Sequence, residues 1–152
     1  MSGTDDAGGG VMLRAFVEAD WATMGPERLT AKLGSYACLH SYALAPAVRQ
    51  QQRQRQRQQS FPEPVQETWC QRYPLFPRLL FVLGRRRPTG VETRIHALRA
   101  AARDITLTGF PREVPVLAAA MTDLLRHVPT TPVWRPVHDL DHRVDWMHDR
   151  HP

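Results

Sequence analysis

Long apolar runs, cysteines and lysines are all scarce in this sequence, and each scarcity excludes a class of protein or site. No stretch approaches about 18 apolar residues, which excludes a transmembrane helix, and we expect no contact with a membrane. The N-terminus has neither a basic start nor an apolar segment, so no signal peptide is visible and we expect a cytoplasmic protein. The two cysteines, Cys38 and Cys70, form no CxxC pair, which argues against a disulfide scaffold or a cysteine-based zinc site.

Positive charge exceeds negative charge, and the excess is concentrated in one segment. The chain of 152 residues has 20 basic and 15 acidic residues, a net charge of +5, and Lys32 is its single lysine. Nine arginines and two glutamates lie within residues 49–87, so this segment has a net charge of +7 and the rest of the chain −2. A basic excess of this kind favours a polyanionic partner such as a nucleic acid.

Three stretches have compositions that disfavour packing. Residues 1–10 are rich in glycine, residues 46–66 in proline, glutamine and arginine, and residues 136–152 in histidine and aspartate. We therefore predict a disordered N-terminus, a flexible insertion and a disordered tail over these three ranges. A single domain over residues 11–135, interrupted by the insertion, accounts for the rest of the chain and has a core of modest size.

Periodicity predicts an alternating order of strands and helices. The expected elements are a strand over 11–20, a helix over 26–45, a strand over 79–83, a helix from Thr89, a strand over 114–119 and a short helix over 123–127. Thr89 and Glu92 form a capping box, and Thr122 is expected to cap the short helix. Alternation of this kind indicates an α/β fold, a small mixed, partly parallel sheet flanked by helices.

Two acidic residues close the first predicted strand. Glu18 and Asp20 are two positions apart, so they leave the same face of the strand, and Lys32 on the following helix can reach back towards them. Such carboxylates can hold a hard cation such as Mg²⁺, which activates a water against a phosphodiester. Glu18, Asp20 and Lys32 are thus candidate catalytic residues, and the two acids are candidate ligands of a weakly bound metal. The alternative is that both acids cap the sheet end or pair with Arg14 and Lys32.

A set of short motifs resembles the signature of the replication-relaxation family. The motifs are Phe16-Val17-Glu18-Ala19-Asp20, Thr23-Met24, Leu29, Lys32-Leu33 and Tyr36, then Tyr73-Pro74-x-Phe76-Pro77-Arg78-x-Leu80-x-Val82, and finally Pro132-Val133-Trp134. The similarity covers most of the predicted domain. It implies an actinobacterial protein linked to plasmids or mobile elements, whose C-terminal domain has a restriction-endonuclease-like fold and acts on or near DNA. Glu18 and Asp20 match the acidic strand of that family, and Lys32 matches its helix lysine.

The chain departs from the family pattern in two places, within residues 20–23 and in the segment before the first predicted strand. The Asp-Arg-Gly-Thr run of the family reads Asp20-Trp21-Ala22-Thr23 here, so the arginine and the glycine are lost. A nuclease of this class takes a further acid from a preceding strand, and here only Asp5 and Asp6 precede, within a glycine-rich segment. The N-terminal winged helix of the family is also missing. The resemblance therefore implies a truncated restriction-endonuclease-like domain with an incomplete metal site, and we expect no cleavage of DNA.

Two other interpretations fit the same differences from the family pattern. The missing first strand would leave an open sheet edge, which a protein partner or a second copy of the chain could fill. The chain would then be a protein-interaction module. It could also be a non-functional C-terminal fragment of a longer DNA-binding protein.

Seven arginines are candidates for contact with DNA. Four belong to the Gln/Arg run and three follow the second predicted strand: Arg49, Arg53, Arg55, Arg57, Arg85, Arg86 and Arg87. Guanidinium groups bind phosphates with release of counterions, so we expect weak, sequence-independent and salt-sensitive binding. The run has no interleaved aromatic residues, so base stacking is not indicated. The alternative is that both segments are solvated surface loops.

Overall fold

Strands and helices alternate along most of the chain. The computed structural model describes residues 13–54, 76–84, 88–104 and 109–148. Its elements are β1 (Ala15–Asp20), α1 (Pro26–Gln54), β2 (Arg78–Leu83), α3 (Pro88–Ala102), α4 (Gly109–Glu113), β3 (Val116–Ala120), α5 (Met121–Arg126) and β4 (Arg135–Pro136). The strands form one sheet in the order β1-β2-β3-β4, with β1 to β3 parallel and β4 antiparallel. The predicted α/β fold with a small mixed, partly parallel sheet is confirmed.

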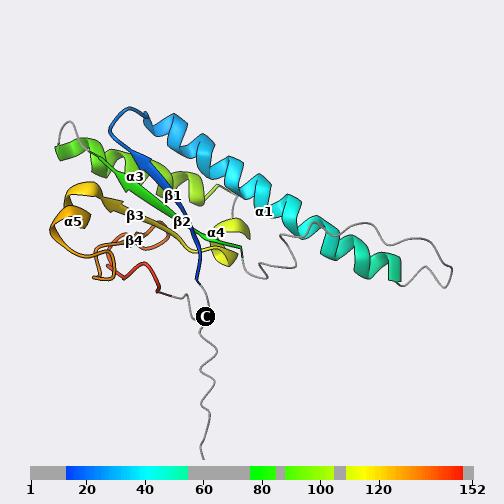
Figure 1. Ribbon diagram of the computed structural model, residues 1–152. Helices are drawn as coiled ribbons and strands as arrows, with labels where there is room; N and C mark the ends of the chain where they lie inside the picture. The colour runs from blue at the N-terminus through cyan, green and yellow to red at the C-terminus, as the bar shows by residue number, and fades with distance from the viewer. Residues whose placement is uncertain (1–12, 55–75, 85–87, 105–108, 149–152) are drawn as a thin grey trace, which may run out of the picture.

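The two longer helices, α1 and α3, cover one face of the sheet (Figure 1). Parallel crossovers are right-handed in nearly all proteins, and both crossovers here advance by one strand in the same direction, which places α1 and α3 side by side. Their buried residues and the inward residues of the sheet form the main core. Its buried members are Leu29, Leu33, Ala37, Leu79, Phe81, Leu83, Val91, Ile95, Leu98, Ala102, Phe110, Val114, Val116, Ala118, Val137 and Leu140.

The opposite face of the sheet is covered by α5 and by the residues that follow it. A second buried cluster lies there, made of Leu80, Leu117, Ala119, Val133 and Trp134. Trp134 is fixed by a β-bridge to Val144, with hydrogen bonds of 3.0 and 2.8 Å. β2 therefore lies between two apolar layers, which is why its sequence from Leu79 to Leu83 is an uninterrupted apolar run rather than an alternating one.

The prediction of a disordered tail over residues 136–152 is wrong for residues 136–148. Val137 and Leu140 are buried in the main core. Arg78, itself buried, donates hydrogen bonds of 2.5 and 3.2 Å to two backbone carbonyls near the end of this segment. Histidine and aspartate dominate the composition of the segment, but its few apolar residues bury enough surface to hold it against the sheet. The domain therefore extends beyond its predicted end.

Helix α1 is longer than the sequence predicted. We expected a helix over 26–45 and a flexible insertion over 46–66, but the helix continues through Pro46 to Gln54. Proline removes one backbone donor, whereas the alanine, glutamine and arginine residues around it have high helix propensity. The start of the predicted insertion is thus helical.

Two predicted strands begin later than expected. The strand predicted over 11–20 begins at Ala15, because its neighbour β2 begins opposite that residue. The strand predicted over 114–119 begins at Val116, and Pro115 before it has no backbone donor to offer the sheet. Both strands otherwise lie where the sequence placed them.

Both helices with a predicted N-cap begin earlier than expected. Helix α3 begins at Pro88, one residue before Thr89. Glu92, the expected partner in the capping box, instead accepts two hydrogen bonds from Arg135 of β4, at 2.7 and 2.9 Å. Helix α5 begins after Ala120 and not after Thr122, and its N-cap makes no side-chain hydrogen bond.

Parts of the predicted domain organisation fall outside the described residues. They are the predicted disordered N-terminus at 1–10, the rest of the predicted insertion at 55–66 and the last residues of the predicted tail at 149–152. Nothing in the structure tests these three predictions.

Candidate functional site

The carboxylates of Glu18 and Asp20 leave the same face of β1, as strand alternation predicted. Both turn towards the helices, whereas the neighbouring Val17 is 60% exposed on the other face. Lys32 of α1 forms an ion pair with Glu18, and Arg94 of α3 forms one with Asp20. The three predicted site residues therefore do not converge on one point, because each acid has its own cation from its own helix.

Glu18 is held by two residues that lie one turn apart on α1. The Tyr36 hydroxyl donates to Oε1 of Glu18 at 2.7 Å, and the Lys32 ammonium binds Oε2. Burial alone would raise the pKa of Glu18, but the hydrogen bonds from Lys32 and Tyr36 and the charge of Lys32 outweigh it, so the pKa lies below its ordinary value. The ring of Tyr36 also packs on Phe16, with 5.3 Å between the ring centroids. Glu18 is thus a charged carboxylate enclosed by its own donors.

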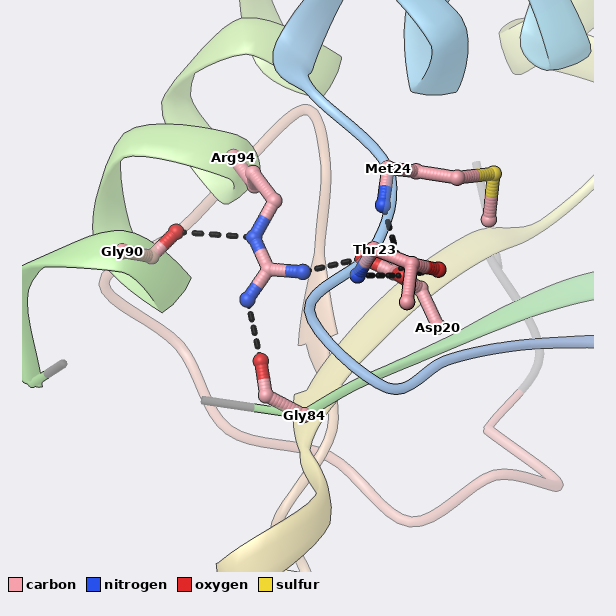
Figure 2. A network of polar contacts seen from close by, with 6 residues as sticks. All are labelled: Asp20, Thr23, Met24, Gly84, Gly90 and Arg94. Atoms are coloured by element: carbon pink, nitrogen blue, oxygen red, sulfur yellow. Dashed lines mark hydrogen bonds and ion pairs between the residues drawn. The ribbon is translucent and has the colours of Figure 1, made fainter. Parts of the chain in front are cut away.

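Asp20 is buried and acts as an acceptor for the loop that follows β1 (Figure 2). Its Oδ1 accepts from the backbone N–H of Thr23 at 2.9 Å, from the Thr23 hydroxyl at 3.2 Å and from the backbone N–H of Met24 at 3.0 Å. Its Oδ2 accepts from Arg94. Burial alone would raise the pKa of Asp20, but the backbone hydrogen bonds and the Arg94 charge lower it below its ordinary value.

The Arg94 guanidinium connects three segments of the chain (Figure 2). Its Nε donates to the carbonyl of Gly90 in its own helix at 2.9 Å, one terminal nitrogen binds Asp20, and the other binds the carbonyl of Gly84 at the end of β2. Arg94 is only 5% exposed, so this buried charge is balanced by the Asp20 carboxylate. The network fixes the carboxyl ends of β1 and β2 to the first turns of α3.

The donor set around Glu18 and Asp20 does not fit a magnesium centre. All four carboxylate oxygens accept hydrogen bonds from protein donors. A divalent cation would have to displace Lys32 or Arg94, and it needs several free oxygen ligands. Within residues 13–54, 76–84, 88–104 and 109–148, no group of three or more histidine, cysteine, aspartate or glutamate side chains is placed to hold a metal ion. The sequence also allowed the interpretation that the acids pair with Arg14 and Lys32. The ion pair between Glu18 and Lys32 agrees with it.

Sequence reasoning missed Arg94 and did not connect Tyr36 to Glu18. Arg94 lies between Val91 and Ile95, on the buried stripe of α3. A buried arginine requires buried acceptors, and a carboxylate is the acceptor that also balances its charge, so this position is a signal for an internal ion pair. The signal does not say which acid is the partner, because that depends on the packing of α3 against the sheet.

The predicted DNA-binding arginines fall in two groups. Arg49 and Arg53 belong to the last turns of α1, which ends at Gln54. The remaining five lie outside the described residues: Arg55, Arg57, Arg85, Arg86 and Arg87.

Ala22 has a backbone conformation that alanine adopts rarely. Its φ is 69°, in the left-handed region, at the position where the family pattern has glycine. We predict that Ala22→Gly raises the free energy of unfolding by about 0.5–1 kcal/mol, because glycine carries no Cβ to strain in this region. Urea denaturation measures the change. The same substitution at the exposed helical Ala31 is the control and should instead destabilise by about 1 kcal/mol; a loss at Ala22 would contradict the strained geometry.

Tyr36 should titrate above the ordinary pKa of tyrosine. Burial and the hydrogen bond and charge of Glu18 raise its pKa to about 12. A raised pKa stabilises the folded protein below the ordinary value of 10, and this contribution is lost as the pH rises towards 12. Tyrosinate absorbance against pH measures the pKa, and Glu18→Gln should lower it by removing the charge. A Tyr36 titration near 10 in the wild-type protein would contradict the contact with Glu18.

Comparison with protein-family models, with curated proteins and with solved structures finds no match for this chain. In the described ranges no helix is long and apolar enough to cross a membrane.

Proposed function

We propose that this chain is a catalytically incomplete, restriction-endonuclease-like domain of the replication-relaxation type, which binds DNA of plasmids or mobile elements without cleaving it. The observation that carries the proposal is the engagement of both acids, Glu18 by Lys32 and Asp20 by Arg94. A nuclease needs carboxylate oxygens free for the metal that activates its water. Here the acidic residues of the motif are present, but their carboxylates bind Lys32 and Arg94 and so stabilise the fold. Cytoplasmic localisation belongs to the same proposal.

The geometry of the motif residues supports the resemblance. Glu18, Lys32 and Tyr36 are separate pieces of the family pattern, and they meet in one cluster between β1 and α1. Asp20 and Thr23 belong to the loop motif, and Asp20 accepts from both the backbone and the hydroxyl of Thr23. Residues that form a pattern in the sequence thus share contacts in the fold. This is the result expected if the pattern records one structural unit.

DNA cleavage and DNA binding are to be measured separately. With Mg²⁺ or Mn²⁺, the isolated chain should leave supercoiled and linear DNA intact, while fluorescence anisotropy should detect weak binding that falls steeply with salt and does not depend on sequence. Metal-dependent nicking that disappears in Glu18→Gln, but persists in the control Asp141→Asn, would overturn the catalytic part. Absence of any binding at low salt would overturn the DNA-binding part.

A second function, a protein-interaction module, is favoured by the position of β1. Within the described ranges β1 is an outer strand of the sheet, with Val17 60% and Trp21 72% exposed. An edge strand presents backbone groups that an added strand can pair with. If β1 mediates self-association, analytical ultracentrifugation should detect a concentration-dependent dimer that Val17→Lys abolishes. A monomer at all concentrations would leave only a different protein as the partner of this edge.

A further inference from the structure

Helix α1 continues well past the part of it that packs on the sheet. The helix has 29 residues, and the last buried residue among its described side chains is His40, whose ring centroid lies 5.1 Å from that of Phe76 and 5.4 Å from that of Phe110. In Figure 1 its C-terminal portion extends away from the sheet and from the other helices. We call residues 44–54 the α1 arm. At 1.5 Å per residue the arm is about 16 Å long.

The composition of the α1 arm indicates the kind of partner that it can bind. No acidic residue occurs between Glu27 and Glu63, so every charge on the arm is positive. Arg49 and Arg53 are four residues apart and so occupy positions on the same side of the helix. Leu44 and Val48 are the only large apolar residues of the arm and none follows Val48, so no apolar stripe runs along it for a membrane surface or a coiled-coil partner. Charge complementarity therefore favours a polyanion.

We infer that the α1 arm binds in the major groove of duplex DNA, with Arg49 and Arg53 neutralising phosphates along the groove. The major groove of B-form DNA is wide enough to admit an α-helix, whereas that of A-form RNA is too deep and narrow. Arginine and glutamine, which make up all of residues 49–54, are side chains that reach phosphates and base edges in this groove. The inference rests on the proposed binding of DNA and adds the element and the groove.

The first part of the experiment removes charge without removing the helix. Arginine and glutamine have similar helix propensities, so Arg49→Gln/Arg53→Gln should keep the α1 arm helical. Fluorescence anisotropy of a short labelled duplex measures the affinity at a series of salt concentrations. The slope of log affinity against log salt should become less negative by roughly 1.8, because two phosphate contacts are lost. The control Arg103→Gln/Arg126→Gln changes two exposed arginines, one directly after α3 and one in α5, and should leave the slope unchanged. Equal effects of the two double variants would overturn the inference.

The second part of the experiment removes the helix without removing charge. Gln51→Pro should break the α1 arm and weaken binding by about tenfold, because the two arginines lose their fixed spacing. Gln51→Ala keeps the helix and should bind as the wild-type protein does. Far-UV circular dichroism should record a loss of helix in the proline variant alone, and thermal melting checks that the domain stays folded.

The outcomes separate this inference from the proposed function. Wild-type binding to DNA that Gln51→Pro leaves unchanged would overturn the helical arm and leave the DNA-binding proposal standing. Duplex RNA bound as tightly as duplex DNA would overturn the major groove as the binding site. No binding of the wild-type protein to either duplex would overturn both proposals.

Discussion

Replacing Asp20 with alanine should lower the free energy of unfolding by about 3–5 kcal/mol, a large part of the stability of a domain of this size. The substitution leaves the buried guanidinium of Arg94 without its counter-charge, and both groups are almost fully excluded from solvent. It also removes the acceptor for Thr23 and Met24, so the loop after β1 loses its side-chain cap. Urea denaturation followed by circular dichroism measures the loss.

Two further variants separate the charge from the loop contacts. Asp20→Asn keeps a side-chain oxygen for the backbone donors of the loop and should cost less than Asp20→Ala. Asp20→Ala/Arg94→Met removes both charges and should be less destabilising than the sum of its single substitutions. A cost of Asp20→Ala within about 0.5 kcal/mol, or strict additivity of the double variant, would contradict the buried ion pair.

Gly84→Ala should destabilise the protein by about 1–3 kcal/mol, because there is no room for a Cβ at this position. An ideal Cβ there would lie 2.9 Å from the carbonyl oxygen of Asp20 and 3.0 Å from Cα of Trp21. Both neighbours are backbone atoms, and the N–H of Gly84 donates to the same Asp20 oxygen at 2.6 Å. The ends of β1 and β2 would have to separate, which would strain the network around Arg94.

Gly34 provides the matched control for this substitution. A Cβ at Gly34 would meet nothing within 4 Å, and the residue lies inside α1. Gly34→Ala should therefore stabilise the protein by up to about 1 kcal/mol through helix propensity. Thermal or urea denaturation of the two variants should give changes of opposite sign. A neutral or stabilising Gly84→Ala would contradict the close approach of the two strand ends.

Local patterns in the sequence predicted the order of the elements and the geometry of β1. Alternation put Glu18 and Asp20 on one face, and the spacing of Lys32 along α1 brought it to the first of them. These relations depend only on residues close in the chain and on the fixed periods of strands and helices. They are therefore readable without knowledge of the tertiary packing.

The partner of Asp20 could not be predicted in the same way. Arg94 is 74 positions away in the chain, and it meets Asp20 only because α3 packs over the ends of β1 and β2. The order of residues 136–148 could not be predicted for a related reason. Val137 and Leu140 are isolated apolar residues in a polar segment, and they are buried by residues distant in the sequence. The length of α1 was misjudged because a helix can continue on propensity and on an existing nucleus, without an apolar stripe.

Isothermal titration calorimetry with Mn²⁺ at neutral pH, in the absence of DNA, tests most directly whether the acids of β1 serve the fold rather than a metal. Because Lys32 and Arg94 already balance Glu18 and Asp20, we expect no saturable heat at sub-millimolar metal. Glu18→Gln should give the same flat titration as the wild-type protein. Saturable sub-millimolar binding that is lost in Glu18→Gln, with the melting temperature unchanged, would contradict this account and identify the β1 end as a metal centre.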